Sequence, residues 1–175
     1  PLPRKKLLSR PRLDSRFAGA LTHRLMVVQA GPGYGKSTSV AKYLSGRPEP
    51  LFWYSASGSD ADPHVFMMHL IWSMRAACPE LGDSALSIID ESRDQRARRR
   101  AVESLANDML DMLAGDAVLV IDDYQSAARN PEIDDIIELL VDTMPPQMHV
   151  VLCTRQRPAL GAMARWRVKG DVLEI

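Results

Sequence analysis

The sequence predicts a doubly wound α/β fold, in which a parallel sheet is covered by helices on both faces. Short apolar, β-branched runs alternate with helical patterns along the 175 residues, as in parallel strands joined by crossover helices. A glycine-rich turn follows the first of these runs, and a later run ends in two aspartates. Ligands of such folds bind at the carboxyl ends of the strands, so we expect the functional site at that edge.

The first predicted strand and the turn after it form a phosphate-binding motif, since residues 25–39 read LMVVQAGPGYGKSTS. Glycines let a backbone curl around a polyphosphate without Cβ clashes, and the following helix points its N-terminus at the anion. In this Walker A pattern Lys36 would reach the β- and γ-phosphates, and the Ser37 hydroxyl would bind Mg²⁺. Ala30 replaces the usual first glycine at the strand end, where a small residue should suffice. The predicted nucleotide-binding residues of the motif are Gly31, Pro32, Gly33, Tyr34, Gly35, Lys36, Ser37 and Thr38.

The second half of the predicted site is the strand 117–123, which reads AVLVIDD. Two adjacent carboxylates at the end of a buried strand cost free energy unless a cation compensates them. In this Walker B pattern Asp122 would hold Mg²⁺, directly or through water, and Asp123 would polarise the attacking water. The alternative is a strand that runs into an acidic turn, and the glycine loop upstream favours the site over that alternative.

A third strand, predicted over 148–153, leads into Thr154 and Arg155. If this strand lies between the two Walker strands, Arg155 sits beside the γ-phosphate, where its fixed, charged fork suits phosphate oxygens. The alternative is a loop arginine in solvent. The predicted catalytic residues are therefore Asp123, Lys36 and Arg155.

The chain ahead of the first strand divides into a flexible lead-in, 1–9, and the start of a nucleotide-binding domain that covers 10–175. Pro11 fixes a turn, and a short helix over 14–23 is expected to feed into the first strand. The basic residues here, Arg10 and Arg12, form either a solvated turn or a segment packed near the adenine.

The remaining elements follow from apolar spacing and helix-end residues. Asp62 followed by Pro63 is a helix start, and we expect this helix to bury one side that includes Trp72. The strand 51–54 reads LFWY and is expected to be buried on both faces. The Asp62 helix is expected to cover 62–78, and a short helix and a loop fall in 81–95. The other predicted helices cover 37–44, 96–113, 131–141 and 160–166. The last predicted strand covers 171–175.

Composition excludes several classes of function. The formal net charge is zero, whereas a domain that binds nucleic acid by itself is usually basic, so Arg98–Arg100 are better read as a solvated helix face. Two cysteines provide neither a disulfide framework nor metal-ligand spacing, and a reducing cytoplasm is the expected location. No apolar run approaches the ~20 residues of a membrane-spanning helix. Because the chain starts at Pro1 and stops at Ile175, we expect a fragment of a longer protein.

Six short motifs form a narrower signature than the glycine loop alone. They are RPRL at 10–13, QAGPGYGKST at 29–38, FWYS at 52–55, ADPHVF at 61–66, LVIDDYQ at 119–125 and VVLCTRQRPAL at 150–160. In this order they resemble the MalT-like regulators, which are large ATP-binding transcription regulators of the LuxR family in the STAND class of signalling ATPases. The resemblance spans roughly 10–175.

The resemblance implies a P-loop NTPase fold, a three-layer α/β/α sandwich with five parallel strands in the order 5-1-4-3-2. Arg155 then resembles the family's sensor arginine, and Arg10 and Pro11 resemble the stretch that lines the adenine pocket. The family's lid, sensor repeats and C-terminal helix-turn-helix are not in this chain. A small-molecule or protein inducer and DNA would therefore be bound through those missing domains. ATP-dependent self-association is a further expectation, and a membrane is not an expected partner.

The function predicted from these observations is an ATP-binding switch with weak Mg²⁺-dependent ATPase activity. ATP and ADP would set an on/off equilibrium in a transcription regulator, and slow hydrolysis would reset it. One alternative is a nucleotide-binding scaffold without useful hydrolysis. Another is a P-loop kinase for a small metabolite, although the tandem aspartates favour water as the acceptor and no substrate lid is evident.

Overall fold

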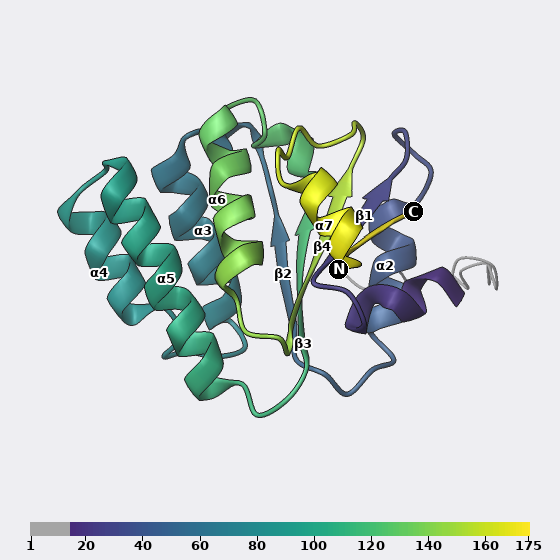
Figure 1. Cartoon of the computed structure of the whole chain (residues 1–175), viewed down its shortest axis with the longest axis horizontal. Helices are drawn as coiled ribbons and strands as arrows, with labels where there is room; N and C mark the ends of the chain where they lie inside the picture. Colours follow the sequence, from purple (N-terminus) through teal and green to yellow (C-terminus); the bar gives the residue numbers. More distant parts are fainter. Residues whose placement is uncertain (1–14) are drawn as a thin grey trace.

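The computed structural model describes residues 15–175 and shows a five-stranded sheet with helices on both faces (Figure 1). The strand order is β2-β3-β4-β1-β5, and every neighbouring pair is parallel. Counted from the other edge, this is the predicted order 5-1-4-3-2, so the predicted fold class is confirmed. The strands are β1 (Leu25–Gln29), β2 (Leu51–Ser55), β3 (Ala117–Asp122), β4 (Met148–Thr154) and β5 (Val172–Glu174).

Alternate residues of the central strands enter two separate cores, one on each face of the sheet. Leu25 and Val27 of β1 pack in the larger core, while Met26 and Val28 pack in the smaller one. Every residue of β3 and β4 is buried, as their unbroken apolar runs predict.

Strand β2 departs from its prediction because it lies at an edge of the sheet. Phe52 and Tyr54 are buried in the larger core, whereas Leu51 and Trp53 on the other face are only partly buried. The expected burial of this strand on both faces is therefore wrong.

Helix α2 covers the smaller core, and α3 to α7 cover the larger one. The expected helix over 14–23 is a short helical turn that continues as a 3-10 helix, η1. In α3 the predicted N-cap is confirmed, because the Asp62 carboxylate accepts the amides of His64 and Val65. Trp72, expected in the core, is 54% exposed. The helices are η1 (Ala18–Leu21), α2 (Lys36–Leu44), η2 (Gly58–Ala61), α3 (Pro63–Arg75), α4 (Asp83–Glu91), α5 (Gln95–Met112), η3 (Tyr124–Ser126), α6 (Pro131–Thr143) and α7 (Met163–Lys169).

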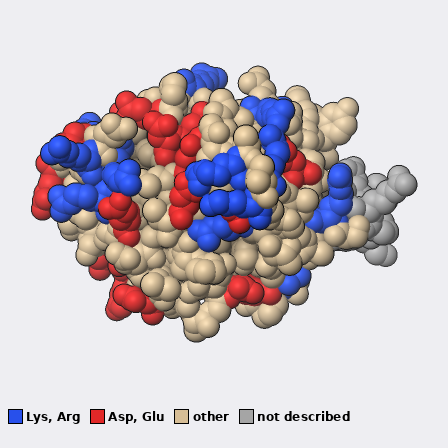
Figure 2. All heavy atoms as spheres, in the orientation of Figure 1, with Lys and Arg blue, Asp and Glu red and all other residues tan. Residues whose placement is uncertain are grey.

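No helix among residues 15–175 has the length and apolar character needed to cross a bilayer. The face shown in Figure 2 carries its Lys and Arg side chains in separate groups with acidic side chains between them. This distribution matches the formal net charge of zero.

Gly82 ends the turn between α3 and α4 in a conformation that only glycine adopts without strain. Its φ is 83°, and a Cβ there would lie 2.5 Å from Ile71 Cγ2 and 3.3 Å from Leu105 Cδ1, both in buried side chains. We expect Gly82→Ala to lower the free energy of unfolding by about 2–4 kcal/mol, measured by urea denaturation. Gly46→Ala is the control, since no atom lies within 4 Å of the added Cβ. Equal free energies of unfolding for Gly82→Ala and Gly46→Ala would show that the backbone conformation and the close packing at Gly82 do not require glycine.

Candidate functional site

The glycine loop joins β1 to α2 at the carboxyl edge of the sheet (Figure 1). Gly33 and Gly35 have φ of 77° and 75°, in the left-handed region. A Cβ at either position would meet no atom within 4 Å, so glycine is needed there for the backbone conformation and not for lack of space. Helix α2 begins at Lys36, and the amides of its first residues have no carbonyl partner within the helix, which leaves them available to an anion.

Lys36 lies inside the curl of the loop. Its Nζ donates to the carbonyl oxygen of Ala30 at 2.7 Å and to that of Gly31 at 3.3 Å. The ammonium is thus held next to the loop amides, where it adds a full positive charge to the partial charge of the helix N-terminus. An anion in the loop would meet both.

Ser37 and Asp122, which are far apart in sequence, form a direct hydrogen bond. Ser37 Oγ donates to Asp122 Oδ1 at 2.7 Å, and the same carboxylate oxygen accepts the amide of Asp123 at 2.9 Å. Asp122 is only 8% exposed, so its charge has little access to water. A buried carboxylate beside a hydroxyl and an ammonium-bearing loop is an arrangement suited to a cation bound together with an anion.

The donor set at this point fits Mg²⁺. A hydroxyl and a carboxylate oxygen are hard ligands, and Mg²⁺ is usually held by one or two such groups together with phosphate and water. Within residues 15–175 no group of three or more His, Cys, Asp or Glu side chains could hold a metal ion. A site made of Ser37, Asp122, phosphate oxygens and water needs no such group.

Asp123 turns its side chain away from the strand that precedes it. It is the one non-glycine residue with a positive φ in the described chain, at φ 51° and ψ 37°. Its Oδ1 accepts Gln125 Nε2 at 2.8 Å and lies 3.4 Å from a guanidinium nitrogen of Arg155. The two side chains of this ion pair are 49% and 43% exposed, and an ion pair so exposed contributes little to the stability of the fold. Its arrangement can therefore serve a purpose other than stability.

The position of β4 explains why Arg155 reaches this place. Strand β4 lies between β1 and β3, with Gln29 opposite Thr154 and Ile121 opposite Leu152. Arg155 follows directly after Thr154, so it emerges between the two predicted Walker strands. Lys36, Ser37, Asp122, Asp123 and Arg155 are therefore at one edge of the sheet.

Cys153 also lies near this edge, but its surroundings suppress thiolate chemistry. Burial raises the pKa of the Cys153 thiol, and the negative charge of Asp122 raises it further. Because the thiolate is the reactive form, this cysteine is an apolar core residue and not a nucleophile.

Other predicted residues differ in their placement. Tyr34 is 69% exposed, and its ring lies next to Gly31 of the same loop, where an added Cβ would be 3.4 Å from Tyr34 Cε2. Arg10 and Pro11, predicted near the adenine, lie outside the described residues. Sequence reasoning missed Gln125, which contacts both Asp123 and Arg155, although the motif LVIDDYQ contains it.

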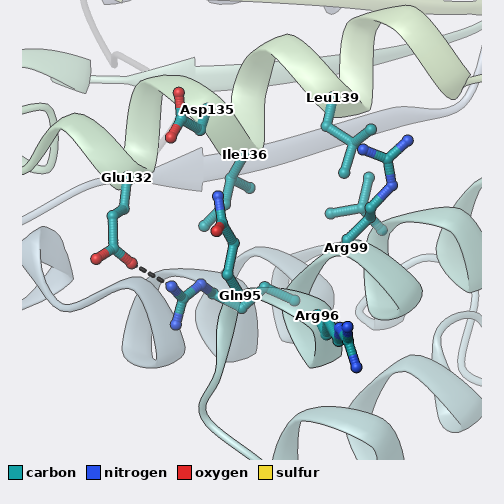
Figure 3. A pocket seen from close by; sticks show the side chains of 9 residues that line it. Gln95, Arg96, Arg99, Glu132, Asp135, Ile136 and Leu139 are labelled. Atoms are coloured by element: carbon teal, nitrogen blue, oxygen red, sulfur yellow. Dashed lines mark hydrogen bonds and ion pairs between the residues drawn. The ribbon is translucent and has the colours of Figure 1, made fainter.

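A separate hollow of about 350 Å³ lies between α5 and α6 (Figure 3). Arg98 of α5 and Glu132 of α6 form an ion pair across it. Arg99 pairs with Glu103 on its own helix at 3.0 Å. None of the predicted nucleotide-binding or catalytic residues that fall within 15–175 lines this hollow.

Comparison with known proteins finds several relatives that carry the same name. No family model matches the chain. It is 32% identical over 169 residues to the HTH-type transcriptional regulator MalT of Cronobacter sakazakii, covering 95% of this chain and 18% of the regulator. The MalT protein of Vibrio cholerae is 28% identical, and the match covers 95% of this chain and 18% of that protein. The MalT protein of Serratia proteamaculans is 29% identical, and the match covers 100% of this chain and 19% of that protein. Over nearly its whole length the chain is similar to regulators named MalT. It spans about a fifth of the length of these relatives.

Solved structures share the fold of this chain. A Signal Transduction ATPase with Numerous Domains (STAND) protein with a tetratricopeptide repeat sensor, from Pyrococcus horikoshii, matches with a TM-score of 0.60 at 19% identity, covering 99% of this chain and 23% of its own. A chain in the structure of Drosophila ORC bound to AT-rich DNA and Cdc6 matches with a TM-score of 0.56 at 10% identity. The match covers 94% of this chain and 55% of that chain. The chain therefore shares the α/β fold of these proteins.

Proposed function

We propose that this chain is an ATP-binding switch domain of a transcription regulator, with slow Mg²⁺-dependent hydrolysis. The observation that carries the proposal is the hydrogen bond of 2.7 Å between Ser37 Oγ and Asp122 Oδ1. It joins a hydroxyl in the first turn of α2, next in sequence to Lys36, to the acid at the end of the distant strand β3. The similarity to regulators named MalT supports the regulatory part of the proposal.

The loop and its lysine would bind the phosphates. The amides of Gly33, Gly35 and the first turn of α2 would donate to the oxygens of the β- and γ-phosphates. Ser37 and Asp122 would hold Mg²⁺, the acid directly or through water. A bound Mg²⁺ would supply positive charge next to the phosphate oxygens.

The tips of β3 and β4 would act on the γ-phosphate. Asp123 is half exposed and lies beyond Asp122, so its carboxylate can orient a water and accept its proton. Arg155, from the neighbouring strand, would stabilise charge on the γ-phosphate through its guanidinium.

ATP and ADP differ only in the γ-phosphate, so only residues that contact it can bias a switch between two states. Lys36 and Arg155 are those residues in this proposal. Recognition of DNA, sensing of an inducer and ATP-dependent self-association would involve other parts of a longer protein, as for regulators of which this chain covers about a fifth.

One observation favours the alternative of a nucleotide-binding scaffold without useful hydrolysis. The Asp123 carboxylate is engaged by Gln125 and lies next to Arg155, so the same oxygen already has two protein partners and is less available to orient a water. The two proposals differ in whether bound ATP is turned over.

Titration of the chain with ATP and with ADP by calorimetry, with Mg²⁺ and then with EDTA, tests the proposal. We expect both nucleotides to bind and ATP to bind more weakly in EDTA. If neither ATP nor ADP bound to the chain, the proposal would be overturned.

Arg155→Ala is expected to weaken ATP binding about tenfold and to leave ADP binding within about twofold, since a charge-assisted contact to the γ-phosphate is lost. The measurement is calorimetric titration with ADP and with a non-hydrolysable ATP analogue. Arg157→Ala is the matched control, an arginine two residues away whose guanidinium lies 3.8 Å from Glu174. Equal weakening of both nucleotides by Arg155→Ala would contradict a γ-phosphate contact.

A further inference from the structure

Gln125 connects the two residues that the proposed function places at the γ-phosphate. Its Nε2 donates to Asp123 Oδ1 at 2.8 Å, and its Oε1 accepts the backbone amide of Arg155 at 2.9 Å. One side chain thus joins the tip of β3 to the tip of β4.

The orientation of this amide follows from its two neighbours. The Arg155 backbone N–H can only donate, so the carbonyl oxygen of Gln125 must face it. The NH₂ group is then directed at the Asp123 carboxylate, which can only accept when ionised. Both ends of the Gln125 side chain are matched in polarity, and reversing the amide would lose both hydrogen bonds.

The segment that bears Gln125 is fixed from behind. Tyr124 is fully buried, and its hydroxyl donates to the carboxylate of Asp134 on α6. Ser126 donates its amide to the Asp123 carbonyl at 2.8 Å, which closes the turn of η3. Gln125 therefore extends from a rigid support, and the flexible partner in this arrangement is the long side chain of Arg155.

We propose that Gln125 is a positioning residue that holds the backbone of Arg155 beside Asp123, so that the guanidinium exchanges between the Asp123 carboxylate and the γ-phosphate of ATP. This inference rests on the proposed function. With ADP bound the guanidinium stays at Asp123, and with ATP bound it moves to the phosphate and frees the carboxylate. The exchange links recognition of ATP to release of the base that the reaction uses.

The geometry supports an exchange of this kind. The distance of 3.4 Å between the Arg155 guanidinium and Asp123 Oδ1 is long for a charge-assisted hydrogen bond, and both side chains are about half exposed. Such a contact is weak, so a dianionic phosphate can compete for the guanidinium. The hydrogen bond from the Arg155 amide to Gln125 is independent of the guanidinium and persists in both positions.

Two variants of Gln125 separate its two hydrogen bonds. Gln125→Met keeps the length of the side chain and removes both bonds. Gln125→Glu keeps an acceptor for the Arg155 amide, replaces the donor to Asp123 by a like charge, and adds an anion that holds the guanidinium away from phosphate. Gln156→Met is the matched control, a glutamine at the same strand tip that forms hydrogen bonds through its backbone.

The first readout needs no nucleotide. Amide hydrogen exchange of Arg155, followed by NMR in each full-length variant of this chain, reports the bond to Gln125 Oε1. We expect exchange about fivefold faster in Gln125→Met and near the wild-type rate in Gln125→Glu and Gln156→Met. A wild-type rate in Gln125→Met would overturn the bridge.

The second readout is the ratio of ADP to ATP-analogue dissociation constants. We expect this ratio to fall about fivefold in Gln125→Met and further in Gln125→Glu, with Gln156→Met unchanged. Gln125→Met is thus expected to have the larger effect on amide exchange, and Gln125→Glu the larger effect on the ratio of dissociation constants. A merely structural role would not produce opposite orders in the two measurements. If Arg155→Ala lowers the ratio while both Gln125 variants keep it, the bridge is wrong and the proposed function stands. If the wild-type chain binds neither nucleotide, the proposed function fails, and the phosphate exchange fails with it.

Discussion

Lys36→Ala is expected to abolish detectable ATP binding, with a loss of affinity of at least about 100-fold, because a charged contact to two phosphates is removed. The structure supports so large an effect, since the Lys36 ammonium lies against the carbonyls of Ala30 and Gly31 within the loop itself. ATP affinity would be measured by calorimetric titration in Mg²⁺-containing buffer. ADP should also bind more weakly, because the lysine would reach the β-phosphate as well.

The matched control for this variant is Lys42→Ala. Lys42 lies on the same helix, α2, and is exposed to solvent. Both variants should unfold at wild-type urea concentrations, because neither side chain is part of the core. Unchanged ATP affinity in Lys36→Ala would show that the glycine loop is not the phosphate site.

Asp123→Asn has the second largest expected effect, on turnover and not on binding. An amide retains the size of the side chain and an acceptor for Gln125, but it cannot take a proton from water. We expect ATP affinity within about threefold of wild type and hydrolysis slower by about 100-fold or more, the usual contribution of a general base. Asparagine also tolerates the left-handed backbone found at this position, with φ of 51°, so the fold should be unaffected.

Release of phosphate in a single turnover, with enzyme in excess over ATP, is the measurement. Asp116→Asn is the control, an acid at the opposite end of the same strand, 3.6 Å from a ring nitrogen of His149. Turnover that survives in Asp123→Asn would exclude this carboxylate as the base. A wild-type chain that binds ATP without turnover would instead support the scaffold alternative.

Much of the fold could be predicted because buried strands have a distinct composition. Residues 117–122 and 148–153 are nearly continuous apolar runs, and both strands lie in the middle of the sheet with helices on either side. The run at 51–54 is equally apolar, yet its strand is at an edge. Its composition alone does not reveal that helices leave Leu51 and Trp53 partly uncovered.

The site could be predicted only where linear motifs carry its chemistry. The glycine loop and the tandem aspartates are each contiguous in sequence, and parallel strands bring their carboxyl ends to one edge. The contacts among Asp123, Gln125 and Arg155 depend on a left-handed turn after β3 and on the register of β4. No local pattern encodes these, so Gln125 was missed. The adenine-pocket residues Arg10 and Pro11 stay a prediction.

The central claim is that the glycine loop and the Asp122–Asp123 pair hold a triphosphate and its Mg²⁺ between them. A crystal structure of this chain with a non-hydrolysable ATP analogue and Mg²⁺ tests it most directly. The account predicts the β- and γ-phosphates against the amides of Gly33–Ser37 and a metal ion about 2.1 Å from Ser37 Oγ, on the side that faces Asp122. A nucleotide bound elsewhere, or a metal ion with no direct or water-mediated contact to Asp122, would contradict it.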